Sequence, residues 1–239
     1  MGRVVAPNVV RIIAIDDASL QALGPWPWPR TLHAELIDTL RRAGVQAIGY
    51  GVMFAEPSRQ PEDDLRLAAA MRAQGRVVLP VLPLRDGSGR PQGVLEPLPL
   101  LAASAAALGH AEAPIDADGR IRGLALQAGS GLQRWEALPL ALQRVAATGS
   151  GGGGGSPGSR LTEPPPEPDP TLPWWRHDLR LLPDRPVRLH VISAIDLLGD
   201  PARAGALLGR SVWVGVTATG IDPALPTPGR AGQVDLLST

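Results

Sequence analysis

The chain has 239 residues and is 44% hydrophobic, so it can build a sizeable core and cannot be disordered throughout. Its 23 basic residues balance 23 acidic ones and are scattered along the chain, so we expect no nucleic-acid partner. The absence of cysteine excludes disulfides, thiol catalysis and cysteine-ligated metal centres.

Strands and helices alternate in the first part of the chain. A β-branched run at 9–15 predicts a buried strand, and leucines at helical spacing predict a helix over about 32–43, capped by Thr31. A second strand is expected at 45–54, a second helix from Pro61 to Gly75, and a third strand from Arg76. Strands joined by helices in this way typically form a parallel sheet.

The second part of the chain is divided by a change in composition. Before it we expect a turn at 86–89, a helix at 97–108, a strand at 121–127 and a helix at 135–146. Residues 148–173 hold 7 glycines and 7 prolines, which predicts a disordered low-complexity insert. After it we expect a strand near 179–182, a helix at 192–198 and a strand at 211–216.

These elements predict an α/β fold with one domain. The piece after the insert has little core of its own, so we expect the strand at 211–216 to complete the first sheet. The domain would then span 8–239, with a mainly parallel sheet flanked by helices and with the insert 148–173 inside it. No apolar run approaches the length of a membrane helix, and the N-terminus lacks the apolar centre of a signal peptide.

Polar residues follow the ends of several predicted strands, namely Asp16, Asp17, Glu56, and Thr217 with Thr219. The carboxyl ends of parallel strands share one edge of a sheet, where ligands bind. The acids could hold a hard cation there, bind a cationic ligand or pair with arginines. They could equally be turn acids and helix caps.

The stretch Trp26-Pro27-Trp28-Pro29-Arg30 is the most unusual part of the chain. Such a rigid, apolar loop could form a ligand wall or a partner surface, or it could fasten a helix start onto the sheet. His33 and His110 are isolated histidines, and such residues more often pack and hydrogen-bond than act as bases.

Signatures of common catalytic sites are missing from the sequence. There is no phosphate-binding loop of the Walker type and no Gly-x-Ser-x-Gly motif. The stretch 116–119 resembles the start of a calcium loop but lacks the required glutamate, which favours a β-turn.

The motifs, taken in order, resemble the second class of CHASE sensor domains. The Asp16-Asp17 pair followed by the Trp-Pro-Trp-Pro-Arg stretch and His33 is the most specific part of the resemblance. Gly51 departs from the family, which usually has Asp there, so a carboxylate of any shared site is absent at this position. The remaining matching stretches are 43–44, 48–57, 63–65, 109–110, 116–122, 193–198 and 208–218.

The resemblance implies an extracytoplasmic, ligand-sensing input domain without catalysis or cofactor. It would belong to a bacterial transmembrane receptor of the adenylate cyclase, diguanylate cyclase or histidine kinase type and lie on the periplasmic or extracellular face of the membrane. The implied partners are a small-molecule or protein ligand, a second copy of the chain, and membrane helices of the full-length protein.

We place the expected ligand site around one cleft near the strand ends. Two other functions compete with the sensor: a metal-dependent hydrolase using Asp16, Asp17 and Glu56, and a structural interaction module whose contact is the Trp-Pro loop. The expected ligand-binding residues are Asp16, Asp17, Trp26, Arg30, His33, Glu56, His110, Arg122 and Thr217.

Overall fold

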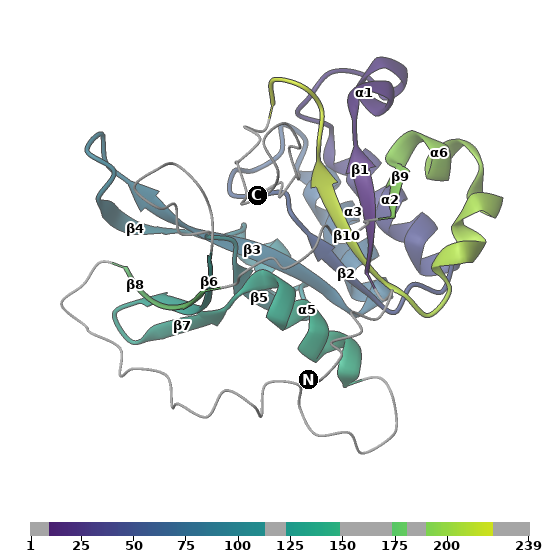
Figure 1. Ribbon diagram of the computed structural model, residues 1–239. Coiled ribbons are helices and arrows are strands. Elements are labelled where there is room, and N and C mark those ends of the chain that lie inside the picture. The colour runs from purple at the N-terminus through teal and green to yellow at the C-terminus, as the bar shows by residue number, and fades with distance from the viewer. Residues whose placement is uncertain (1–9, 113–122, 149–173, 181–189, 222–239) are drawn as a thin grey trace, which may run out of the picture.

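A central sheet of mainly parallel strands organises the protein, seen here in a computed structural model that describes residues 10–112, 123–148, 174–180 and 190–221 (Figure 1). The strands of this sheet run in the order β4-β3-β2-β10-β1-β9, and β5 also pairs with β3. All pairings are parallel except that of β4 with β3. The strands are β1 (Val10–Ile15), β2 (Ala47–Tyr50), β3 (Val77–Arg85), β4 (Pro91–Leu95), β5 (Ala107–His110), β9 (Val191–Ser193) and β10 (Ser211–Val216).

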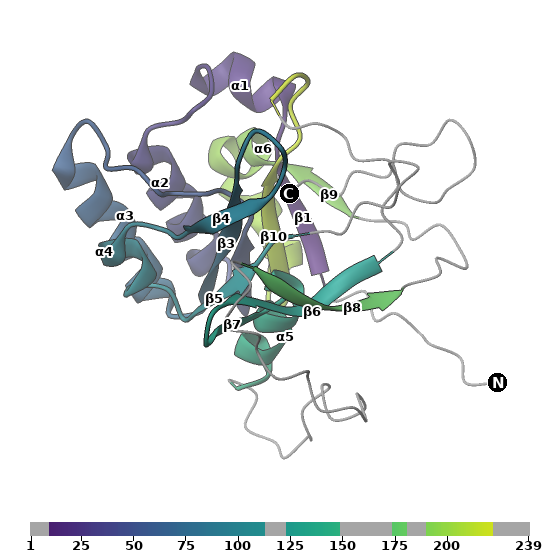
Figure 2. The ribbon, with the colours of Figure 1, turned by 90° about the vertical axis from the view of Figure 1, so that its left-hand side faces the viewer.

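The helices cover both faces of this sheet, which confirms the predicted α/β fold class (Figures 1 and 2). One face packs against α2, α3 and α6, and the other packs against α5. The helices are α1 (Asp17–Leu23), α2 (Arg30–Arg42), α3 (Pro61–Gln74), α4 (Pro99–Ala102), α5 (Leu138–Ala147), α6 (Ala194–Gly199) and the 3-10 helix η2 (Pro201–Leu207).

Strand β10 comes late in the chain but lies between the two early strands β1 and β2. Val212 is opposite Arg11 of β1 and Ile48 of β2, so the last strand fills a gap in the middle of the sheet. The prediction that 211–216 joins the first sheet is therefore confirmed. The strand is buried and rich in β-branched residues. The backbone N–H and C=O groups of such a strand need hydrogen-bond partners on both edges, which β1 and β2 provide.

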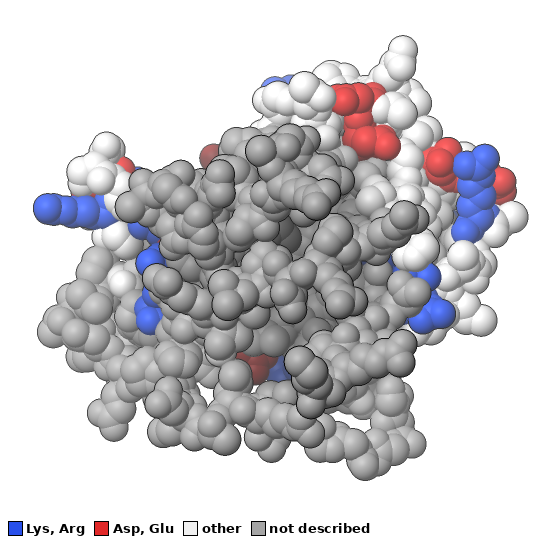
Figure 3. Space-filling model, viewed as in Figure 1, with Lys and Arg blue, Asp and Glu red and all other residues white. Residues whose placement is uncertain are grey.

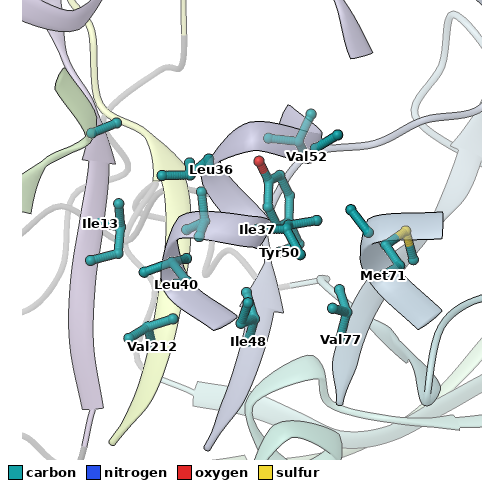
Figure 4. Packing of buried hydrophobic residues seen from close by; sticks show 14 of the residues in the cluster. Ile13, Leu36, Ile37, Leu40, Ile48, Tyr50, Val52, Met71, Val77 and Val212 are labelled. Atoms are coloured by element: carbon teal, nitrogen blue, oxygen red, sulfur yellow. The ribbon is translucent and has the colours of Figure 1, made fainter. Parts of the chain in front are cut away.

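A large core lies between the sheet and helices α2 and α3. Leu36, Ile37 and Leu40 from α2 and Met71 from α3 belong to one buried apolar cluster with Ile48 of the sheet (Figure 4). These residues recur at helical spacing, so the hydrophobic pattern of the sequence had indicated the buried face of α2 correctly.

Helix α3 begins and ends as the sequence predicts. Pro61 occupies the first turn with three acids after it, and Gly75 at φ 76° closes the helix by donating its N–H to Met71 O. Helix α2 differs, because it begins at Arg30 after Pro29 at the N-cap position and has no side-chain cap. The predicted cap Thr31 is thus wrong and lies inside the helix.

The helix predicted at 97–108 is also wrong. Only α4, a single turn, is helical there, and residues Ala107–His110 form β5 beside β3. The Ala106 N–H donates to Val77 O at 2.8 Å, which begins this pairing. The free edge of β3 gives the segment backbone partners, and these outweigh the helical propensity of its alanines.

A second, three-stranded antiparallel sheet lies beside α5 and was only partly expected (Figures 1 and 2). It consists of β7 (Gln133–Glu136), β6 (Gly123–Ser130) and β8 (Trp175–Arg180), in that order. The sequence predicted strands at 121–127 and 179–182 but read 135–146 as one helix, whereas α5 begins only at Leu138. The insert at 149–173 lies outside the described residues.

The visible charged surface mixes both signs. Figure 3 shows acidic atoms over α1 and acidic and basic atoms side by side over α6 and η2, where Arg203 pairs with Asp196 and Asp200. Among the described residues, no helix is long and apolar enough to cross a membrane.

Candidate functional site

The predicted site begins at the carboxyl end of β1, where Asp16 caps α1. Its Oδ1 accepts hydrogen bonds from the Ser19 N–H (2.9 Å), the Ser19 hydroxyl (2.7 Å) and the Ser193 hydroxyl (2.8 Å). Burial raises the pKa of Asp16, but the bonds from Ser19 and Ser193 outweigh it, so the pKa lies below its usual value. Asp16 is thereby held as a carboxylate that joins β1 to β9.

Ser19 completes this junction from inside the protein. It is fully buried, and its hydroxyl accepts a hydrogen bond from the Ile195 N–H at 3.2 Å. The starts of α1 and α6, which are far apart in the sequence, are thus fixed to each other through one serine. Sequence reasoning missed Ser19 and Ser193, because nothing in either local sequence indicates the other.

Asp17 faces solvent next to this junction and contacts the segment that follows β10. Its two carboxylate oxygens accept from the N–H (2.9 Å) and the hydroxyl (3.0 Å) of Thr219. Thr217, the expected site residue, instead continues the sheet by donating its N–H to Ile15 O. We call Asp16, Asp17, Ser19, Ser193 and Thr219 the carboxyl-edge cluster.

This cluster is acidic and lined with hydroxyl groups. In the described part of the chain, no arginine pairs with either of its carboxylates. Such an edge can bind a cation or a hydrogen-bond donor through Asp17. Its position after the carboxyl ends of parallel strands β1, β9 and β10 is where open α/β sheets bind ligands.

A second group of predicted residues surrounds His33 on α2. His33 is buried, and its Nδ1 is 2.9 Å from the Tyr50 hydroxyl at the end of β2. The rings of Trp26, Trp28 and Phe54 lie with centroids 5.0–6.0 Å from the imidazole. Burial, reinforced by the nearby Arg30 charge, lowers the pKa of His33 to about 3, so the ring is neutral at ordinary pH.

The Trp-Pro loop acts here mainly as a fastening of α2 onto the sheet. Trp28 belongs to the core and donates its indole N–H to Gly24 O at 3.0 Å, and the Trp26–Pro27 peptide bond is cis. Trp26 is only partly buried, so it is the one tryptophan of the pair that a ligand or partner can reach.

Arg30 belongs to this second group and pairs with an acid that the sequence did not single out for it. Its Nε lies 3.2 Å from Asp64 Oδ1, its guanidinium carbon is 4.5 Å from the Phe54 ring centroid, and another nitrogen donates to the backbone carbonyl of Glu56 at 2.9 Å. Of the acids that the sequence analysis offered as arginine partners, Arg30 thus contacts only Glu56, and it does so through the backbone carbonyl. Its ion pair is with Asp64, which α3 brings beside it.

His110 lies in a third place, where β5 meets the second sheet. Burial lowers its pKa to about 4; the Ala125 backbone opposes this in part, but neither ring nitrogen has a partner at hydrogen-bonding geometry. The Trp174 ring stands edge-on to it at 6.4 Å and donates its indole N–H to buried Glu112. Glu112 also pairs with Arg85, a contact that no sequence pattern indicated.

The described residues of the predicted site thus form three groups of mutual contacts, and the prediction that they surround one cleft stays a prediction. No hydrogen bond, ion pair or ring contact between described residues joins the carboxyl-edge cluster, the His33 group and the His110 group. Arg122 lies outside the described residues. Whether any of these residues binds a ligand remains a prediction.

The metal-dependent hydrolase has little support from this arrangement. Asp16 is occupied as a helix cap, and Glu56 is exposed and contributes its backbone carbonyl to Arg30. No group of three or more His, Asp or Glu side chains in the described ranges could hold a metal ion.

Gly51, the departure from the family pattern, lies close to the backbone of Val214 and to the ring of Trp213. A Cβ at Gly51 would lie 3.1 Å from Val214 O and 3.3 Å from the indole nitrogen of Trp213. The Trp213 ring also lies over Gly49, where a Cβ would be 3.0 Å away. A side chain at position 51 would therefore be crowded by the Val214 carbonyl and the Trp213 ring.

Together, the fold and the edge cluster define an α/β domain with a polar site at the carboxyl ends of its parallel strands. The family model of the CHASE2 domain matches residues 1–236. The chain belongs to the CHASE2 family, a family of extracytoplasmic sensory domains. No curated protein and no solved structure matches the chain.

Proposed function

We propose that this chain is a non-catalytic, ligand-sensing input domain of a bacterial transmembrane receptor of the cyclase, diguanylate cyclase or kinase type. The observation that carries the proposal is family membership over almost the whole chain, combined with a polar cluster at the carboxyl edge of the sheet. The domain would work on the periplasmic or extracellular side of the membrane.

The carboxyl-edge cluster is the ligand contact that we favour, with a cationic organic molecule as its ligand. Asp17 is exposed, carries a charge without an arginine partner among the described residues, and contacts Thr219 at the point where the chain leaves β10. A cation that binds Asp17 would compete with or reinforce that contact. A ligand shifts a sensor between two states only by its difference in affinity for them, and this contact offers such a difference.

Ligand binding is tested by thermal unfolding of the chain with a library of small amines and other metabolites. A ligand at 100 times its Kd stabilises the native state by about 2.7 kcal/mol, which raises Tm by several degrees. We expect the stabilisation to disappear in Asp17→Asn and to persist in Glu35→Gln, a matched change of an exposed acid on α2. Equal stabilisation of both variants would place the ligand elsewhere.

Location and the lack of turnover need separate measurements. In the natural host, alkaline phosphatase fused in frame directly after Thr239 should be active, since this enzyme works only outside the cytoplasm. An inactive fusion would contradict the extracytoplasmic position. Conversion of any stabilising ligand into product by the purified chain, abolished by Asp17→Asn, would favour an enzyme instead.

A further inference from the structure

The outer half of β3 and strand β4 form a two-stranded arm, residues 82–95, that projects from the central sheet (Figures 1 and 2). Its turn is held by Asp86, whose Oδ1 accepts from the N–H and hydroxyl of Ser88 and from the Arg90 N–H at 2.6–2.9 Å. These bonds, led by the Ser88 hydroxyl, lower the pKa of Asp86 to about 2. An exposed hairpin fixed in this way is preorganised for binding, because little conformational freedom remains to be lost.

The outer edge of β4 carries backbone N–H and C=O groups that do not bond to β3. Within the described ranges β4 pairs with β3 alone. Val94 lies opposite Pro83, which has no N–H, and Pro91 lies opposite Arg85, so the positions bonded to β3 are those of Gly93 and Leu95. The N–H and C=O of Val94 therefore face away from β3.

The arm also exposes an apolar strip at its middle. The Leu84 side chain lies over Gly93, about 4.0 Å from where a Cβ would be, and remains 45% exposed. Leu82 and Leu95, opposite each other on the same face, are only partly buried. A partner that approaches the edge at Gly93 would cover this strip.

The charges at the two ends of β4 complement each other across Gly93. Arg90 lies three positions before this glycine and Glu96 three positions after it, and both are exposed. Neither side chain makes an ion pair with another described residue. An antiparallel copy of the same strand, centred on Gly93, would bring each Arg90 near the partner's Glu96, within reach of these two long side chains in spite of the bulge at Gln92.

We infer that the β3–β4 arm is a self-association surface, on which a second copy of this chain pairs edge to edge about a twofold axis at Gly93. The two Arg90–Glu96 pairs set the register, and the two Leu84 side chains form one apolar strip across the axis. The pairing itself rests on the arm alone; only its strength on a membrane rests on the proposed function.

The contact is weak and selective. The arm is short, and the register of β4 skips Gln92, a bulge of the kind that keeps sheet edges from pairing with arbitrary strands. The choice of a second copy of this chain as partner must then come from the side chains, through the complementary charges of Arg90 and Glu96. Tethering to a membrane would raise the effective concentration enough for a weak contact to form.

Sedimentation equilibrium of the whole chain, at concentrations up to about 1 mM and at low salt, tests the inference. Wild type should dimerise reversibly. Arg90→Glu and Glu96→Arg should each weaken dimerisation by about tenfold or more, because attractive pairs become repulsive ones. Arg66→Glu, at an exposed position on α3, changes the net charge by the same amount as Arg90→Glu and should dimerise like wild type.

The decisive measurement mixes the two charge variants. The Arg90→Glu variant has glutamates at positions 90 and 96, and the Glu96→Arg variant has arginines at both. Opposite charges therefore face each other again only in the mixed dimer of these two variants and in the dimer of the Arg90→Glu/Glu96→Arg double variant. Unchanged unfolding of each variant by circular dichroism shows that its fold is intact. A monomeric wild type, unaffected single variants, or a mixture that associates no better than its components would each overturn the inference.

Discussion

At the residue scale, two buried neutral histidines make the protein sensitive to acid. The folded pKa values of His33 and His110 are lowered to about 3 and about 4, against about 6.5 in an unfolded chain. The stability from their neutral forms is complete above pH 6.5. Below pH 6.5, each histidine lowers the free energy of unfolding by about 1.4 kcal/mol for every pH unit, until the pH reaches its pKa in the folded protein.

Between pH 7 and pH 5 we therefore expect the free energy of unfolding to fall by roughly 3–4 kcal/mol for the pair of histidines. Urea unfolding at both pH values measures this. His110→Leu removes two unpartnered nitrogens, so it should not destabilise the protein at pH 7 and should remove about half of the fall. The same fall in this variant as in wild type would show that His110 does not carry the effect.

Asp16 should matter for stability through its hydrogen bonds, whatever its role toward a ligand. Asp16→Ala removes the acceptor of three hydrogen bonds and the cap of α1, so we expect a loss of about 1–3 kcal/mol in thermal or urea unfolding. Asp38→Ala, which breaks only an exposed pair with Arg41, should cost less than about 1 kcal/mol. Equal losses would mean that the Asp16 junction is not a structural centre.

At the element scale, the contact between β5 and α5 depends on one glycine. A Cβ at Gly109 would lie 2.6 Å from the Cα of Leu138, which is backbone and cannot move aside without shifting the helix. We expect Gly109→Ala to cost about 2 kcal/mol or more in urea unfolding. Gly205→Ala, where nothing lies within 4 Å, should stay within about 0.5 kcal/mol of wild type, and a similar value for both would contradict the close approach.

The sequence predicted elements best where local pattern and tertiary need agree. Helix α3 has its proline, acids and closing glycine in one local stretch, and β10 is a compact β-branched run. The helix predicted where β5 lies is wrong because the alanines of this segment favour a helix. Pairing with the edge of β3 makes the segment a strand, and the sequence does not reveal that this edge is available.

The site was predicted in part for the same reason. The acids after β1 could be placed at the sheet edge from strand direction alone, and Asp17 does lie there with Thr219. The Ser19–Ser193 contact and the Arg30–Asp64 pair join residues 174 and 34 positions apart, and no local pattern encodes such partners.

At the scale of the whole molecule, the late strand β10 makes the two parts of the chain interdependent. A fragment of residues 1–147 lacks β10 and β9, so β1 loses both of its neighbours. We expect this fragment to show no cooperative thermal transition, in contrast to the whole chain. A cooperative transition at the wild-type Tm would show that the first part folds as an independent domain.

The central claim is that this chain is a sensory input whose ligand contact is the carboxyl-edge cluster. The most direct test measures the signalling output of the receptor that contains it, in its own host, under inducing and non-inducing conditions. We predict that Asp17→Asn combined with Thr219→Val removes the difference between the two conditions, and that Glu35→Gln retains it. A double variant that responds like wild type would contradict the claim.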